Sequence, residues 1–165
     1  MLASKKIINQ ANKVLTSGNL LIFPTETVYG LGADATNNVA VKKIYKLKKR
    51  PLGNPIISHF ENIEKVREHA ELNNSAEKIA EIFWPGPLTL ILKKRSRSNI
   101  SPLVSNNNEL IACRVPQNPI SQQILKKFSK PIAAPSANIF TKLSTTSIEH
   151  IHNKLRKNIL IIDGG

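Results

Sequence analysis

Four short apolar runs of this sequence each end in polar residues that could bind an anionic ligand. These polar residues are Thr25 with Thr27, Ser58 with His59, Arg114, and Ser136 with Asn138. Ligand sites in α/β proteins are built beyond the ends of strands, so we expect the four segments to line one cavity. Hydroxyl, amide, imidazole and guanidinium groups in one cavity suit a phosphate together with a small zwitterion.

A basic run at residues 42–50 follows the first of these segments and ends before Pro51. On a helix end, its lysine and arginine side chains would place positive charge opposite the hydroxyls of residues 25–27, which would suit an anionic ligand. The run could equally be a solvated helix face. The sequence has neither a P-loop nor a dinucleotide-binding fingerprint, so a nucleotide site must be built in another way.

The same residue types also have structural interpretations. Ser136 and Asn138 could form only a turn or a helix cap, and His59 could be a buried structural histidine. His150 and His152 are two residues apart on a predicted helix. They would therefore face different ways and make a poor metal-binding pair.

The composition indicates one domain, residues 1–165, with a core of its own. The 24 Lys and Arg residues against 11 Asp and Glu give a net charge of +13, which favours polyanionic partners or reflects a generally lysine-rich surface. The one cysteine, Cys113, excludes a disulfide framework and a thiolate metal cage. With no signal-type apolar core and no membrane-spanning run, we expect a soluble cytoplasmic protein.

Helical periodicity alternates with short apolar runs along the whole chain. The spacing predicts helices at residues 4–18, 38–50, 63–70, 74–83, 119–128 and 148–155, the fourth capped by Asn74, and strands at residues 20–23, 55–59, 88–92, 109–115, 131–135 and 159–162. Residues 93–108 are polar, basic and unpatterned, and are predicted to be a mobile loop. Trp84 is expected to be a core anchor and Cys113 a small buried hydrophobe. The pattern is typical of an α/β domain, called α+β in some schemes.

Five motifs, in this order along the chain, resemble those of the YrdC/TsaC family, the threonylcarbamoyl-AMP synthases. They are PTETVYGLG at residues 24–32, KKRPLGNPIISH at 48–59, WPGPLT at 84–89, CRVP at 113–116 and APSAN at 134–138. The resemblance covers nearly the whole chain. It implies an open, twisted mixed β-sheet flanked by helices, with a concave basic surface.

The resemblance also implies an activity. The family makes L-threonylcarbamoyladenylate from L-threonine, bicarbonate and ATP with release of pyrophosphate, a nucleotidyltransferase reaction. This is the first step of the N6-threonylcarbamoyladenosine (t6A) modification of tRNA. The implied partners are these substrates, the proteins that transfer the threonylcarbamoyl group onward, and tRNA through the basic surface. No membrane partner is expected.

Particular residues match the family's functional positions. Those that the resemblance assigns to ATP are Lys48, Arg50, Arg114, Ser136 and Asn138. Those that it assigns to threonine are Thr25, His59, Arg114 and Ser144. Lys48 and Arg50 would be the catalytic cations, exposed in the pocket, with the other basic residues of the run at the surface. Mg²⁺ would arrive with ATP, with no protein ligand.

The implied chemistry needs no catalytic carboxylate. Threonine's amine takes up carbon dioxide, and the carbamate oxygen then attacks the α-phosphate of ATP. Such phosphoryl chemistry depends on positioning and positive charge. Glu26 is the nearest acidic residue, and we expect it to be structural.

Two departures from the family pattern affect these expectations. Ile139, Phe140 and Thr141 follow Asn138 where the family usually has Ser-Gly, and Ser144 begins Ser-Thr-Thr where it has Ser-Pro-Thr. Family members also commonly continue beyond an Asp-Gly-Gly with residues that help to cover the nucleotide, which would make this chain a minimal or a truncated enzyme.

Two rival functions follow from the same resemblance. One is an RNA-binding module of this fold with weak or lost catalysis, although such a module would not need the pocket residues. The other is a carbamoyl-adenylate domain like that of the hydrogenase-maturation proteins, whose zinc-finger and acylphosphatase-like regions have no counterpart in this sequence.

Overall fold

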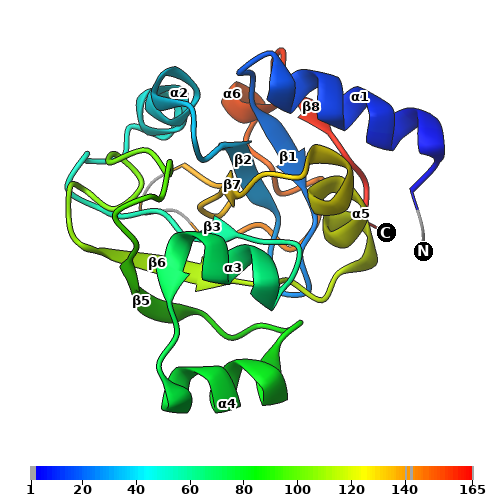
Figure 1. Cartoon of the computed structure of the whole chain (residues 1–165). Coiled ribbons are helices and arrows are strands. Elements are labelled where there is room, and N and C mark those ends of the chain that lie inside the picture. The colour runs from blue at the N-terminus through cyan, green and yellow to red at the C-terminus, as the bar shows by residue number, and fades with distance from the viewer. Residues whose placement is uncertain (1–2, 140, 142, 165) are drawn as a thin grey trace.

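A mixed β-sheet runs through the protein, whose computed structural model describes residues 3–139, 141 and 143–164. Its eight strands follow the order β4-β5-β6-β3-β7-β2-β1-β8 (Figure 1). Their bounds are β1 Leu21–Phe23, β2 Gly30–Asp34, β3 Ser58–His59, β4 Ala70–Glu71, β5 Leu90–Lys94, β6 Leu110–Arg114, β7 Ile132–Ala133 and β8 Leu160–Ile161. The β1–β8 and β3–β6 pairs are parallel and the other pairs are antiparallel. The predicted open mixed sheet is confirmed.

Helices cover both faces of this sheet (Figure 1). Their bounds are α1 Lys5–Thr16, α2 Asn38–Lys48, α3 Ile63–His69, α4 Asn74–Phe83, α5 Pro119–Phe128 and α6 Asn153–Arg156. Leu21 and Phe23 of β1 pack in a core with α1 and α5, whereas Ile22 between them packs in a core with α2. Successive side chains of a strand point to opposite faces, so this fully apolar strand serves both cores.

The caps of α1, α2 and α5 are Ser4, Asn37 and Asn118, at the predicted starts of these helices. Ser4 accepts a hydrogen bond from the Ile7 amide, and the Asn37 side chain accepts from two amides of the first turn of α2. Two predicted boundaries are wrong. The cap of α4 is Asn73 instead of Asn74, and α6 begins only at Asn153, so the helix predicted over residues 148–155 is too long.

The strand β2 was not among the predicted elements. It pairs antiparallel with β1, so residues 24–29 form the connection of a hairpin. Its sequence, GLGAD, lacks the branched residues that mark strands. Gly32 is required by packing, because a Cβ there would lie 2.7 Å from Cε1 of Phe23 and 2.9 Å from Cγ2 of Ile132.

The loop predicted at residues 93–108 is confirmed from residue 95 onward, where the chain forms neither helix nor strand. Its mobility stays a prediction. Lys93 and Lys94 complete β5, and the chain beyond them packs against the body of the protein. Ile100 and Val104 are buried in the core next to α2. The sequence did not indicate this packing, because Ile100, Leu103 and Val104 follow neither a helical nor a strand period among the serines and asparagines around them.

Other expectations for single residues hold. Cys113 is fully buried, and burial raises the pKa of its thiol. Trp84 is buried in the core, where its indole Nε1 donates to the Leu88 carbonyl at 2.8 Å. No helix in the described part of the chain is both long enough and apolar enough to span a membrane.

Candidate active site

The sheet order brings the predicted site segments together. Strand β3 lies between β6 and β7, and His59 pairs with Arg114 across the parallel β3–β6 pair. Beyond β7, Ser136 forms an isolated bridge with Gly30 at the start of β2. Arg114 also reaches the turn before β2, where its Nη2 donates to Thr27 Oγ1 at 3.2 Å. The four polar strand ends therefore lie near one another, but of their polar residues only Asn138 lines the cavity described below, so the prediction of one shared cavity stays a prediction.

Arg114 is the buried cation of this site. Its Nη2 lies 2.8 Å from Glu26 Oε1, and its Nε donates to the Gly86 carbonyl at 3.3 Å. Burial pushes the pKa of Glu26 upward, but Arg114 and two backbone amides outweigh it, so the pKa lies below its ordinary value. Sequence reasoning missed this ion pair, because nothing in the spacing of Glu26 and Arg114 indicates contact.

His59 lies beside Arg114 as a buried, neutral imidazole. Burial, and then the charge of Arg114, lower the pKa of His59 to about 4. Its ring meets Phe23 edge-on, with 6.1 Å between centroids. Among the described residues, neither His59 Nδ1 nor Ser58 Oγ has a hydrogen-bond partner. The structure thus shows the buried histidine of the structural interpretation, and the contact of His59 with threonine stays a prediction.

Thr25 organises the turn that faces this pair. Its Oγ1 donates to the Val28 carbonyl at 2.6 Å, accepts from the Val28 amide at 3.2 Å and lies 3.1 Å from Thr27 Oγ1. The hydroxyl thus replaces backbone partners in the turn. Its predicted contact with threonine stays a prediction.

Lys48 is buried, which contradicts the prediction of an exposed pocket cation. Only 1% of its surface is accessible, and its Nζ donates to the carbonyls of Ser136, at 2.5 Å, and Asn138. Burial, and then the charge of Arg50, lower the pKa of Lys48 to about 8. The amine therefore braces the Ser136–Asn138 segment, because α2 ends directly behind that segment.

Arg50 lies at the surface of the same corner and is half-buried. Its Nη2 donates to the Pro55 carbonyl at 2.8 Å and its Nε to the Asn54 carbonyl at 3.2 Å. These bonds hold the guanidinium against the loop between α2 and β3. Of Lys48 and Arg50, the two cations predicted to be catalytic, Arg50 is thus the more accessible.

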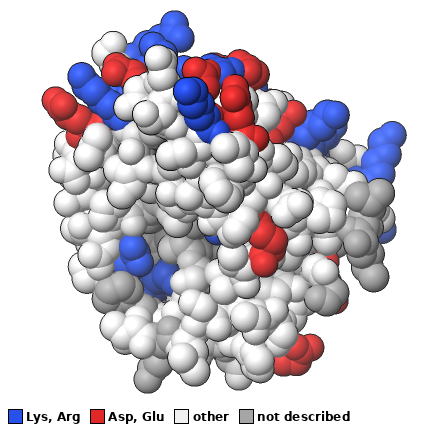
Figure 2. All heavy atoms as spheres, turned by 90° about the horizontal axis from the view of Figure 1, so that it is seen from below, with Lys and Arg blue, Asp and Glu red and all other residues white. Residues whose placement is uncertain are grey.

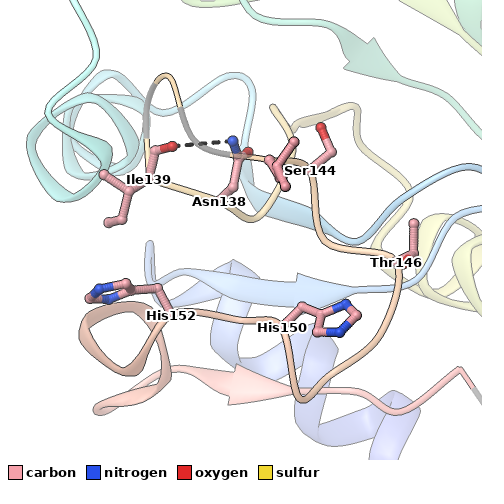
Figure 3. Close-up of a pocket in the computed structure, with 7 residues that line it drawn as sticks. Asn138, Ile139, Ser144, Thr146, His150 and His152 are labelled. Carbon is pink, nitrogen blue, oxygen red and sulfur yellow. Dashed lines mark hydrogen bonds between the residues drawn. The ribbon is translucent and has the colours of Figure 1, made fainter.

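Ser136 and Asn138 form a compact polar group above Lys48. Ser136 Oγ lies 2.5 Å from Asn138 Oδ1, and Asn138 Nδ2 donates to the Ile139 carbonyl at 3.1 Å (Figure 3). Their geometry is that of a turn, as the structural interpretation held, yet the turn opens onto a cavity. Phe140, one of the departures from the family pattern, lies outside the described residues.

A cavity of about 700 Å³ begins at this turn (Figure 3). Its lining residues are Asn138, Ile139, Leu143, Ser144, Thr146, His150 and His152. The expectation that the two histidines lie on one helix and face apart is wrong, because both precede α6 or cap it, and both line this cavity. No group of three or more His, Cys, Asp or Glu in the described part of the chain is placed to hold a metal ion.

The underside of the molecule is hollowed, and Figure 2 shows lysine or arginine side chains inside the hollow. The acidic side chains visible on this face lie outside the hollow (Figure 2). This confirms the predicted concave basic surface. Such a surface attracts anions, because the low-dielectric walls of a hollow focus the field of its charges.

Known proteins share both the sequence and the fold of this chain. The family model of the Sua5, YciO and YrdC proteins, which carries the description "Telomere recombination", matches residues 13–165. The threonylcarbamoyl-AMP synthase of Bacillus subtilis is 42% identical over 160 residues, which cover 96% of this chain and 46% of that protein. The threonylcarbamoyl-AMP synthase of Psychromonas ingrahamii is 34% identical over 164 residues, which cover 98% of this chain and 85% of that protein.

A solved structure gives the same result. The structure of P. abyssi Sua5 complexed with L-threonine matches with a TM-score of 0.94 at 40% identity, over 100% of this chain and 49% of that one. This chain therefore spans about half the length of the Bacillus and P. abyssi relatives. The match of the family model to nearly all of the sequence, together with these relatives, shows that the chain belongs to the Sua5/YrdC family.

Proposed function

We propose that this protein is a nucleotidyltransferase that makes L-threonylcarbamoyladenylate from L-threonine, bicarbonate or carbon dioxide, and ATP. The observation that carries the proposal is the convergence of four motif segments on Arg114, His59 and the Ser136 turn. This convergence occurs on a fold that matches the threonine-bound P. abyssi protein over the whole chain. The product would serve the first step of t6A formation on tRNA, in the cytoplasm.

Threonine would bind at the Arg114 end of the site. The guanidinium is fixed by Glu26, Thr27 and Gly86, and a fixed guanidinium suits a carboxylate. The neutral ring of His59 lies next to it and can accept or donate a hydrogen bond without adding charge. Thr25, in the facing turn, and Ser144, on the wall of the cavity, would complete the contacts with this substrate.

ATP would bind at the Ser136 end, with Arg50, Ser136, Asn138 and Arg114 toward its phosphates. Lys48 would contribute mainly by holding the Ser136 turn in place, because its amine donates hydrogen bonds to the carbonyls of that turn. This arrangement places fixed positive charge around the phosphates, which stabilises the charge that develops in phosphoryl transfer. Mg²⁺ carried by ATP would neutralise further phosphate charge.

The reaction balances in two steps. The amine of threonine and bicarbonate give the carbamate and water, and a carbamate oxygen then attacks the α-phosphorus of ATP. The bond from that phosphorus to the bridging oxygen breaks, and pyrophosphate leaves. The protein's contribution is to hold the two substrates in line.

Pyrophosphate release tests the proposal. Purified protein should release pyrophosphate from ATP only when both L-threonine and bicarbonate are present, and D-threonine serves as the control for site-specific binding. Release at the same rate without threonine would overturn the proposal.

An RNA-binding module of the same fold is the alternative function, and the net charge of +13 would suit contacts with RNA phosphates. No release at all, with salt-sensitive tRNA binding, would support that alternative.

A further inference from the structure

We infer that Glu26 is a positioning residue, which holds the Arg114 guanidinium so that one edge of it faces the amino-acid substrate. The inference rests on the proposed function, because it takes threonine as the ligand of Arg114. It assigns to Glu26 a role in substrate affinity, where the sequence suggested only a structural one.

The ion pair of these residues is buried and close. Glu26 Oε1 lies 2.8 Å from Arg114 Nη2, and only 18% and 8% of the two side chains are exposed. Arg114 makes no other ion pair within the described part of the protein, and its hydrogen-bond acceptors, Thr27 Oγ1 and the Gly86 carbonyl, are neutral. Removing one member of a buried ion pair leaves the other charge uncompensated. Glu26 therefore determines whether a charged guanidinium can occupy this position.

A second contact fixes Glu26 itself. The Asn118 amide, at the residue that caps α5, donates to Glu26 Oε2 at 3.4 Å. The adjoining Pro24 carbonyl accepts a hydrogen bond from Ser121 Oγ, also on α5. One carboxylate thus joins the start of α5 to Arg114. Because Glu26 has a lowered pKa, it is ionised at neutral pH.

The contacts of Arg114 show which edge is left for a ligand. Its hydrogen bonds and its ion pair to described residues use Nε and Nη2. Nη1 has no acceptor among these residues, so it is available to a substrate carboxylate. Without Glu26, only the neutral acceptors Thr27 Oγ1 and the Gly86 carbonyl would hold the guanidinium, and it would lose the charged partner that helps to set the direction of Nη1.

The test is the affinity for L-threonine, measured by calorimetry without ATP and as KM in the pyrophosphate assay. Glu26→Gln keeps the size of the side chain and an acceptor for the Asn118 amide but removes the charge. We expect a roughly tenfold weaker affinity for L-threonine and less than about a threefold change in the KM for ATP. Glu81→Gln, on the exposed surface of α4, is the matched control and should leave both values unchanged.

Glu26→Asp provides the second variant. It keeps the charge with a shorter reach, so threonine affinity should lie between those of the wild type and Glu26→Gln. Wild-type threonine affinity in a folded Glu26→Gln protein would overturn the inference and leave the proposed function intact. If Glu26→Gln does not fold, wild-type affinity in Glu26→Asp would overturn it. Failure of the wild-type protein to bind L-threonine would instead refute the proposed function.

Discussion

At the scale of single residues, Lys48 shows that a motif residue can support the backbone of a site without being exposed in it. Its amine is buried and directed at two backbone carbonyls of the Ser136 turn. Lysine is rarely buried without partners of this kind. The loss of activity expected on changing Lys48 should therefore come with a loss of stability, which an exposed pocket cation would not cause.

Lys48→Met is the first prediction. It keeps an unbranched side chain but leaves the carbonyls of Ser136 and Asn138 without their donor. We expect the free energy of unfolding, measured with urea, to fall by about 1–3 kcal/mol relative to the wild type. We also expect a higher KM for ATP in the pyrophosphate assay. Lys46→Met, on the exposed face of the same helix, should change neither. Unchanged stability in Lys48→Met would contradict the bracing role.

His59 gives a prediction about pH. Its pKa is about 4 in the folded protein and 6.5 is its ordinary value, so the unfolded state binds more protons between these values. The stability from neutral His59 is therefore fully present above about pH 6.5 and is lost as the pH falls toward 4. The loss should be on the order of 3 kcal/mol, at about 1.4 kcal/mol per pKa unit.

Urea unfolding at several pH values between 7 and 4.5 measures this loss. His59→Gln should flatten the decline relative to the wild type, whereas His150→Gln, at an exposed residue, should keep the wild-type slope. Identical slopes in the His59 variant and the wild type would mean that another group causes the acid sensitivity.

At the scale of elements, the hairpin of β1 and β2 places the Thr25 turn and Gly30 next to the site. Phe23 and Ile132 approach Gly32 so closely that no side chain fits between them. We expect Gly32→Ala to lower the free energy of unfolding by about 1–3 kcal/mol, because overpacking forces neighbouring side chains or backbone to move. Urea unfolding measures the change.

Gly53→Ala is the matched control, because a Cβ at that position would have no neighbour within 4 Å. It should leave stability within about 0.5 kcal/mol of the wild type. If the two alanine variants were equally stable, the close packing of Gly32 against Phe23 and Ile132 would not limit stability.

These elements also show what local sequence can and cannot predict. The helices α1, α2 and α5 were predictable because Ser4, Asn37 and Asn118 combine a cap with an apolar stripe. Strand β2 was not, because its glycine-rich sequence is selected by the neighbours it packs against. Tertiary contact determines such a segment, and a sequence window does not contain that contact.

The candidate site also has features that the sequence can predict and features that it cannot. Its strand ends could be predicted because an apolar run followed by polar residues marks the edge of a sheet, and the sheet pairs β3 with β6. The Glu26–Arg114 pair and the burial of Lys48 could not, because each depends on contacts between distant parts of the sequence. Motif resemblance named the residues but gave neither their exposure nor their ion-pair partners.

At the scale of the whole molecule, the net charge of +13 and the basic hollow act together on anionic ligands (Figure 2). ATP carries several negative charges, whereas threonine is a zwitterion with no net charge. Salt screens interactions beyond a Debye length, which is about 10 Å at 0.1 M and about 3 Å at 1 M. The field of the molecule should therefore favour ATP over threonine, and only the ATP interaction should weaken strongly in salt.

Steady-state pyrophosphate release at rising sodium chloride concentration tests this. Between about 50 mM and about 500 mM salt, the KM for ATP should rise several-fold, while the KM for L-threonine changes less than about twofold. Threonine is the internal control, because general inhibition by salt would affect both constants. Equal rises in the two KM values would show that the basic hollow does not select the nucleotide by charge.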